Sequence, residues 1–305
     1  MARYLLRSLV RMMVAIWGIS VMAFVLTYVI GDPLTVLLPW DTPKEAREEY
    51  RRQMGLDQPL PVQYLRFASG AVRADFGNSF YAKKPATSLV LERMPATLIL
   101  TFSGLILALA ISIPAGVISA YKPYTWIDNV VTILAIAGQA MPIFWLGLML
   151  MILFAVNLRL LPASGYGTWQ NLVLPAVCLS VFLAPITMRL MRSGMLDVLH
   201  ADYVRTARSK GLAEATVLLR HAIRNALIPV VAVIGLQFGQ LLGGAIVTET
   251  VFAWPGVASL VVNAIRNTDY PIVQAAVMLL AGLITVINLI TDAIIYTLDP
   301  RISRQ

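Results

Sequence analysis

The strongest constraint on the fold of this chain is a series of long, almost uncharged apolar stretches. A membrane-spanning helix needs about 20 mostly apolar residues. Six stretches meet this requirement, at 9–30, 96–120, 127–156, 172–188, 227–252 and 272–298. Charged residues make up only 13% of the chain, which is about half the share found in soluble domains. The sequence therefore predicts an all-α polytopic membrane protein with six transmembrane helices.

The first and third stretches need separate interpretation. Basic residues precede the first, as in a signal peptide, but its apolar part exceeds the usual length of about 7–15 residues. It is followed by Gly31-Asp32-Pro33 and not by a small-x-small cleavage site, so we expect this helix to be retained. The third stretch is long enough to tilt or break, and Pro142 lies inside it.

The distribution of basic residues predicts the orientation of the chain. The net charge is +8, but the basic residues lie between apolar stretches, so no nucleic-acid partner is expected. If the N-terminus is cytoplasmic, the short outer loops hold only Arg159 and Arg266. The inner segments then hold Arg3, Arg7, Arg11, Lys122, Arg189, Arg192, Arg205, Arg208, Lys210, Arg220, Arg224, Arg301 and Arg304. This bias follows the positive-inside rule and predicts that both termini are cytoplasmic.

Two hydrophilic regions lie between the spans. The outer one has mixed charge and is expected to form a small helical extracytoplasmic insertion. Its segment Thr42-Pro43-Lys44-Glu45 is typical of a helix start, with proline at the first helical position and an acid in the first turn. The other region is a cytoplasmic loop before the fifth span. The predicted organisation is an N-terminal segment and first span (1–30), the insertion (31–95), a core of five spans (96–298) containing the loop (189–225), and a cytoplasmic tail (299–305).

The cytoplasmic loop has the most specific pattern in the chain. It reads as short helices at 192–199, 202–210 and 213–225. Gly211 between the last two can adopt the left-handed conformation that ends a helix. A simple connector needs only about two to eight residues. A helix–turn–helix element of this length is therefore suited to dock into a groove on a cytoplasmic partner.

The loop sequence Asp-Tyr-Val-Arg-Thr-Ala-Arg-Ser-Lys-Gly-Leu, at 202–212, resembles the EAA loop of binding-protein-dependent ABC importers. The core of that loop is Glu-Ala-Ala, three residues and Gly, and the aligned positions here are Arg205, Thr206, Ala207 and Gly211. The first two depart from the general pattern and match the version found in the dipeptide, oligopeptide and nickel branch. Pro229 lies further from the glycine than in the general family, again as in that branch.

Further motifs along the chain are similar to the same branch, and most closely to the B-type permeases of dipeptide systems. Each is weak alone, but their order and their places between the spans make the set specific. They are Gly55-Leu56-Asp57-Gln58-Pro59-Leu60, Met94-Pro95-Ala96-Thr97, Leu161-Pro162-Ala163-Ser164-Gly165-Tyr166, Val251-Phe252-Ala253-Trp254-Pro255-Gly256, Asp269-Tyr270-Pro271 and Leu298-Asp299-Pro300-Arg301.

The resemblance implies a type I ABC importer permease fold in the bacterial inner membrane. The implied function is translocation of dipeptides or short oligopeptides delivered by an extracytoplasmic binding protein. Nickel, a nickel chelate or a glutathione-like peptide is the alternative cargo. The implied partners are a second homologous permease and two cytoplasmic ATP-binding subunits, besides the binding protein and the lipid bilayer. ATP and Mg would be bound by those subunits, and no cofactor by this chain, in which no lysine precedes the Ser or Thr of a phosphate-binding loop.

By the same resemblance, residues 202–212 form a coupling helix that sits in a cleft of an ATP-binding subunit. Closure of the ATPase would push this helix and tilt the spans. Three of its basic side chains can pair with acids of that subunit; alternatively, they only hold the loop at the cytoplasmic face. The residues expected to contact the ATPase are Asp202, Tyr203, Arg205, Thr206, Ala207, Arg208, Lys210, Gly211 and Leu212.

Polar side chains inside the spans are costly, so each indicates either a translocation pathway or an interhelical hydrogen bond. The pathway candidates are Gln139, Gln237, Gln240 and Asn288. Glycines also recur every four residues on one face of the fifth span, which predicts close packing against the partner permease or a neighbouring span. These helix-packing residues are Gly235, Gly239 and Gly243.

The sequence shows no catalytic constellation and no metal site. His200 and His221 lack further ligands, and Cys178 lies in an apolar stretch where an inert thiol is expected. A six-span membrane enzyme would need several titratable groups at one depth, but only Asp292 lies deep in a span. A channel or secondary transporter would have no use for the coupling loop. The chain is therefore interpreted as a transport subunit and not as an enzyme.

Overall fold

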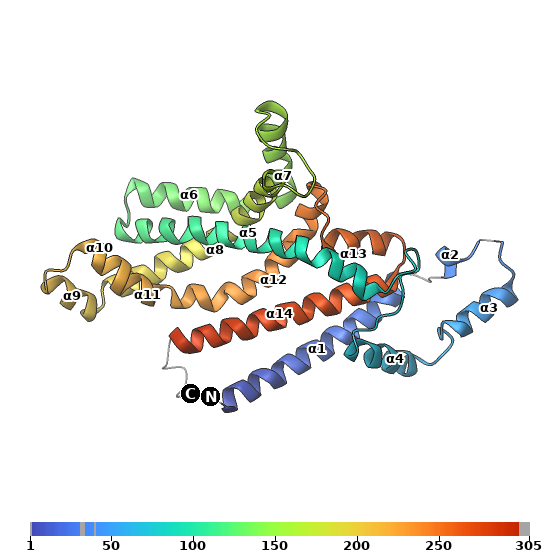
Figure 1. Cartoon of the computed structure of the whole chain (residues 1–305). Coiled ribbons are helices and arrows are strands. Elements are labelled where there is room, and N and C mark those ends of the chain that lie inside the picture. The colour runs from blue at the N-terminus through green and yellow to red at the C-terminus, as the bar shows by residue number, and fades with distance from the viewer. Residues whose placement is uncertain (1, 31–33, 40, 299–305) are drawn as a thin grey trace. The chain divides into compact units, whose positions relative to one another are not determined.

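The computed structural model describes residues 2–30, 34–39 and 41–298. Over these residues the chain is helical, with one isolated β-bridge between Asn78 and Pro85. The predicted tail 299–305, most of the motif at 298–301, and Gly31-Asp32-Pro33 lie outside the described residues. The helices are α1 (Ala2–Ile30), α2 (Leu34–Leu37), α3 (Lys44–Gln53), α4 (Leu60–Val72), α5 (Ala86–Tyr121), α6 (Trp126–Ala140), α7 (Ile143–Leu150), η1 (Met151–Asn157), α8 (Trp169–Leu199), α9 (Asp202–Ser209), α10 (Glu214–Thr216), η2 (Val217–Ala222), α11 (Ile223–Ala226), α12 (Ile228–Val251), α13 (Val257–Arg266) and α14 (Tyr270–Leu298) (Figure 1).

The helices form two compact units. The N-terminal unit comprises Met1–Thr97 and Pro255–Val286, and the core unit comprises Leu98–Trp254 and Ile287–Gln305. The long helices α5 and α14 each contribute to both units, because the division falls within them.

Four of the expected spans lie in helices that are long and apolar enough to cross a membrane, namely α5, α8, α12 and α14. A fifth is formed by two helices that meet at a bend. The first expected span lies in α1, where the apolar part with described side chains is Val10–Leu26. Trp17 and Met22 in this part are 63% and 68% exposed, as expected for side chains that contact lipid and not water.

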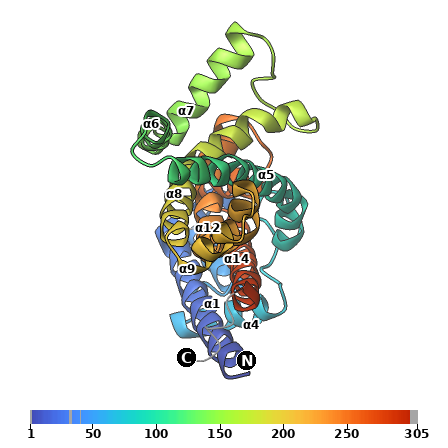
Figure 2. The same ribbon diagram turned by 90° about the vertical axis from the view of Figure 1, so that its left-hand side faces the viewer.

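The third expected span is broken. Helices α6 and α7, the latter continued by η1, meet at an angle of 105° (Figure 2). Met141 has an extended backbone with ψ 128°, because the residue before a proline is pushed out of the helical region. Pro142 then precedes the first residue of α7. Of the two possibilities for this long stretch, the structure therefore adopts the break.

Helix α8 is longer than predicted. The stretch 192–199, expected as a separate helix of the cytoplasmic loop, is the continuous end of α8. Residues 188–192, Met-Arg-Leu-Met-Arg, are good helix formers. The helix also continues through Gly194, where a Cβ would lie 2.9 Å from the carbonyl oxygen of Ala226. The first separate element of the loop is α9.

The predicted insertion is helical and belongs to the N-terminal unit. Helix α3 begins at Lys44, so Pro43 precedes the helix and does not occupy its first position, a shift of one residue from the prediction. Helix α4 packs on α1, where the hydroxyls of Ser20 and Tyr64 lie 2.9 Å apart. The ring centroids of Phe24 and Tyr64 are 5.6 Å apart in an edge-on contact.

Two of the recognised motifs join distant segments of the N-terminal unit. The backbone N–H of Val257, at the start of α13, donates a 2.8 Å hydrogen bond to the hydroxyl of Thr97. Asp269 accepts hydrogen bonds from the Ser79 hydroxyl at 2.6 Å and from the Phe80 N–H at 3.2 Å. These contacts fix the starts of α13 and α14 against the segment around α5.

Two further motifs meet in the core unit. The Gly165 N–H donates to the carbonyl oxygen of Phe252 at 3.2 Å. The rings of Tyr166 and Trp254 stack edge to face with centroids 4.9 Å apart. The segment before α8 is thereby held to the end of α12.

Helices α5 and α8 approach each other at two glycines of α5. A Cβ placed on Gly116 would lie 2.7 Å from the Cβ of Met191 and 2.8 Å from the carbonyl oxygen of Met188. At Gly104 the same atom would lie 2.9 Å from the Cβ of Leu179. Only glycine permits this separation, because any larger residue would push the two helices apart.

The glycines of the series on α12 have different surroundings. A Cβ on Gly235 would lie 2.3 Å from the side-chain oxygen of Asn288 on α14, so this position is a close approach. Gly243 instead is exposed, with nothing within 4 Å of the added atom. Gly235 therefore packs against a neighbouring helix of this chain and Gly243 does not, and contact of this glycine face with the partner permease stays a prediction. The adjacent Gly244 makes ordinary contact with Ile143 and Leu179.

Candidate functional site

The loop between α8 and α12 forms the helix–turn–helix element that its sequence predicts. Helix α9 turns Val204 and Ala207 inward, where they pack with Val217 of η2. Gly211 adopts φ +76°, and its N–H donates to the carbonyl oxygen of Arg208 at 2.9 Å. The left-handed glycine therefore closes α9 and lets the chain turn back into α10.

The loop is anchored to the helices of the core unit. A buried cluster joins Ala120 of α5 and Met191 and Met195 of α8 to Ala222 and Ala226 at the end of the loop. Figure 1 shows α9, α10 and α11 gathered at the end of α8 and the beginning of α12. Any movement of the loop must therefore be accommodated by these helices.

The nine residues expected to contact an ATPase do not all lie on the surface. Ala207 is 7% exposed and supports α9 from inside the loop. Asn225 donates a 2.7 Å hydrogen bond to the hydroxyl of Tyr203, which orients this exposed ring. The exposed members of the set are Asp202, Tyr203, Arg205, Thr206, Arg208, Lys210, Gly211 and Leu212.

The three basic residues of α9 and its turn have different surroundings. Arg208 makes a two-pronged ion pair with Glu214, with Nη2–Oε1 and Nε–Oε2 distances of 2.7 and 3.2 Å. Arg205 lies 3.8 Å from Asp202, and both side chains are largely exposed. Lys210 is exposed. Sequence reasoning missed Glu214, although its position just beyond a glycine turn is a usable signal.

We expect the Arg208–Glu214 pair to stabilise the turn at neutral pH and to lose this effect in acid. The hydrogen bond from Arg208 lowers the pKa of Glu214 below its ordinary value. The pair therefore stabilises the fold above the ordinary glutamate pKa, and the effect is lost as the pH falls through the lowered pKa. At pH 7, Glu214→Gln should speed amide hydrogen exchange in 208–217 by about two- to fivefold.

The same exchange measurement at acidic pH should show wild type and Glu214→Gln converging. Asp202→Asn is the matched control, because its carboxylate makes only a long, exposed contact. Equal exchange in wild type and Glu214→Gln at pH 7 would show that the pair does not hold the turn.

The C-terminal half of α8 makes polar side-chain contacts with two other helices. Gln237 of α12 is 2% exposed and exchanges hydrogen bonds with the Thr187 hydroxyl at 3.0 and 3.2 Å. The exposed side chain of Gln139 on α6 accepts a 3.0 Å hydrogen bond from Arg189. Two of the four pathway candidates thus act as interhelical partners here. Gln240 and Asn288 are exposed, and their place in a pathway stays a prediction.

A third tie on α8 joins Arg192 to Asp128. The Asp128 carboxylate accepts hydrogen bonds from Arg192 Nη2 and Nε at 2.7 and 2.9 Å. It also accepts from the Ser119 hydroxyl and, at 2.9 Å, from the Tyr124 N–H. The Asp128 side chain is 5% exposed. Sequence reasoning missed this tie because it counted Arg192 only as a topological charge, although an acid at the edge of an apolar stretch is itself a signal.

Comparison with known proteins places the chain in a family. Residues 112–304 match the family described as "Binding-protein-dependent transport system inner membrane component", and residues 1–101 match the N-terminal region of such membrane components. The chain belongs to this family of inner-membrane transport components. This permease is 37% identical to the glutathione transport system permease protein GsiC of Escherichia coli (strain K12), over 99% of both chains. It is 40% identical to the oligopeptide transport system permease protein AppB of Bacillus subtilis (strain 168), again over 99% of both.

The fold of this permease also matches solved structures. An inward-facing structure of the MetNI methionine ABC transporter superposes with a TM-score of 0.59 at 17% identity, covering 69% of this chain and 96% of that chain. At this identity the match supports the fold alone. The expectations of an all-α permease of the type I ABC importer class, located in the bacterial inner membrane, are confirmed.

Proposed function

We propose that this permease translocates dipeptides or short oligopeptides, delivered by an extracytoplasmic binding protein and driven by ATP hydrolysis on separate subunits. The observation that carries the proposal is its similarity over nearly the whole length to two permeases with peptide cargo. One is an oligopeptide permease and the other a permease for glutathione, which is a tripeptide. Two related cargos of one chemical class favour peptides over nickel or a nickel chelate.

The proposed assembly contains a second homologous permease, two ATP-binding subunits with their ATP and Mg, and the binding protein. The proposed topology has six spans with both termini in the cytoplasm, as the positive-inside bias indicates. The exposed side of α9 would sit in a cleft of an ATP-binding subunit. Arg205 and Lys210 are the basic residues best placed to meet acids there, since Arg208 already pairs with Glu214.

The structure supports a direct mechanical connection from this docking element to the spans. Helix α8 runs without interruption from the membrane to His200, two residues before α9. Its hydrogen bonds to α6 and α12 join three helices of the core unit through the C-terminal half of α8. A displacement of α9 would therefore move packed helices as rigid bodies, which is how closure of a partner drives alternating access.

Uptake measurements test the proposed cargo. Cells lacking this gene should lose accumulation of labelled dialanine or of a labelled longer peptide, while nickel uptake measured in parallel is unchanged. Restoring the gene should restore peptide uptake, and deleting the cognate ATPase should abolish it again. Loss of nickel uptake alone would contradict the peptide assignment and leave the fold and the coupling scheme intact.

A further inference from the structure

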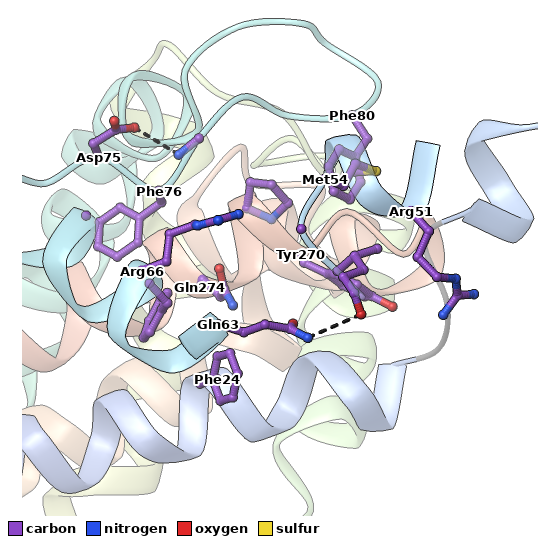
Figure 3. A pocket seen from close by; sticks show the side chains of 16 residues that line it. Phe24, Arg51, Met54, Gln63, Arg66, Asp75, Phe76, Phe80, Tyr270 and Gln274 are labelled. Carbon is purple, nitrogen blue, oxygen red and sulfur yellow. Dashed lines mark hydrogen bonds between the residues drawn. The ribbon is translucent and has the colours of Figure 1, made fainter. Parts of the chain in front are cut away.

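The N-terminal unit contains a pocket that the coupling scheme does not use. Its volume is about 670 Å³, within the range of about 300–1,000 Å³ typical of small-molecule sites. Figure 3 shows its wall, which comes from α1, the end of α3, the turn between α3 and α4, α4 itself, the segment after α4 and the start of α14. Under the proposed topology this pocket lies on the extracytoplasmic side.

Aromatic rings supply the apolar part of the wall. Phe24 of α1 and Phe67 of α4 lie 6.0 Å apart between ring centroids, and Phe67 and Phe76 lie 6.2 Å apart. Phe80 meets Tyr270 of α14 edge to face at 6.1 Å. Such a group of rings can accept an apolar side chain in several orientations.

The charged part of the wall is predominantly cationic. Of the described residues that line the pocket, three are charged, namely Arg51, Arg66 and Asp75. The Asp75 carboxylate accepts the Gly77 N–H at 3.0 Å. The Asp75 carboxylate is thus engaged by the turn after α4, whereas Arg66 makes no ion pair with any described residue and can accept an anionic ligand.

The position of Arg66 depends on Gly55. A Cβ at residue 55 would lie 2.1 Å from Nη1 of Arg66, so the guanidinium lies directly against the glycine. Gly55 also has φ +68°, a left-handed conformation that ends α3. Gln63 fixes the following turn by donating to the carbonyl oxygens of Leu56 and Gln58. The motif at 55–60 thus has a definite role, which is to form this wall and make room for Arg66.

We propose that this pocket binds the short peptides of the proposed cargo directly, with the C-terminal carboxylate on Arg66 and an apolar side chain among the rings. The inference rests on the proposed function. A guanidinium fork matches the two oxygens of a carboxylate, and such charged hydrogen bonds are stronger than neutral ones. The Gln274 amide on α14 faces the same space and can bind the peptide backbone (Figure 3). The permease then has its own peptide site in addition to that of the binding protein.

Direct binding measurements test this assignment without ATP or the binding protein. The full chain is purified in nanodiscs of zwitterionic lipid and titrated with labelled Ala-Phe and with its C-terminal amide. The free acid should bind, and the amide should bind about tenfold or more weakly, because one charged hydrogen-bond partner is lost. This comparison changes only the ligand, so it does not depend on how any variant folds.

A pair of arginine variants locates the site. Arg66→Gln should weaken binding of the acid by about tenfold. Arg52→Gln removes an equal charge from the exposed side of α3, outside the pocket wall, and should leave binding unchanged. Equal binding of acid and amide, or equal effects of the two variants, would overturn the assignment.

Three further outcomes show whether the pocket assignment alone fails or the proposed function fails with it. A phospholipid headgroup is another amphiphilic anion, so displacement of Ala-Phe by discs of anionic lipid would assign the pocket to lipid and overturn the peptide inference. Gene-dependent peptide uptake without binding by the purified chain would overturn this inference and leave the proposed function standing. Peptide uptake that does not depend on the gene would overturn both.

Discussion

Replacing Arg192 by alanine should lower the free energy of unfolding of the purified permease by about 3–5 kcal/mol. The substitution leaves the Asp128 carboxylate, 5% exposed, without its cation, and an uncompensated buried charge is far more costly than a lost surface pair. Asp128 keeps the hydrogen bonds from Ser119 and Tyr124, which places the expected loss toward the lower end of that range. Titration with a denaturing detergent in mixed micelles, followed by circular dichroism, measures the loss.

Two further variants test whether the loss of stability comes from breaking the Arg192–Asp128 ion pair or from removing any charge from α8. Arg189→Ala removes an exposed arginine three residues earlier, whose side chain donates a hydrogen bond to Gln139. This substitution should lower the free energy of unfolding by less than about 1 kcal/mol. The double variant Asp128→Leu with Arg192→Met removes both charges and should recover most of the stability. If Arg192→Ala lowered the free energy of unfolding as little as Arg189→Ala, the ion pair between Arg192 and Asp128 would not stabilise the fold.

Adding one methyl group at Gly116 should destabilise the core unit by about 1–3 kcal/mol or more. The new atom would lie 2.8 Å from the carbonyl oxygen of Met188 and 3.1 Å from the backbone nitrogen of Arg192. Backbone atoms inside a helix cannot move aside as a flexible side chain can, so α5 and α8 must separate. The shift also displaces Arg192 from Asp128, so Gly116→Ala should reduce transport as well as stability.

Gly243→Ala is the matched control, because its methyl group meets nothing within 4 Å. Alanine is the better helix former, by up to about 1 kcal/mol, so the effect should be neutral or stabilising. The same detergent titration distinguishes the two substitutions by the sign of the change. Similar losses at both positions would mean that the contact of α5 with α8 is not as close as described.

Sequence reasoning identified the elements whose signal is local. The lengths of the apolar stretches predicted α12 and α14 within two residues, and Gly211 predicted the end of α9. Sequence reasoning did not predict that α8 continues past Met188, because the charged residues there were interpreted as the start of a loop. A hydropathy pattern records what surrounds a helix and does not mark where its hydrogen bonds stop.

The polar contacts of the core unit could not be predicted in the same way. Arg192 and Asp128 are 64 residues apart and Thr187 and Gln237 are 50 apart, and spacing along one helix does not pair residues on different helices. The glycines illustrate the same limit. Regular four-residue spacing drew attention to Gly243, which is exposed, while Gly104 and Gly116 form the close approach without any such repeat.

The unbroken length of α8 has a geometric consequence. Its 31 residues, which include Pro175 and Pro185, form one helix about 46 Å long, and the side chain of Thr187, near the middle of that helix, is hydrogen-bonded to Gln237. When α8 rotates about this point as a stiff helix, a tilt of about 10° displaces its two ends by roughly 4 Å in opposite directions. A sideways displacement at the α9 end would therefore reach the Trp169 end as a displacement of similar size and opposite sense. One helix thus connects the loop around α9 with the segment that precedes Trp169.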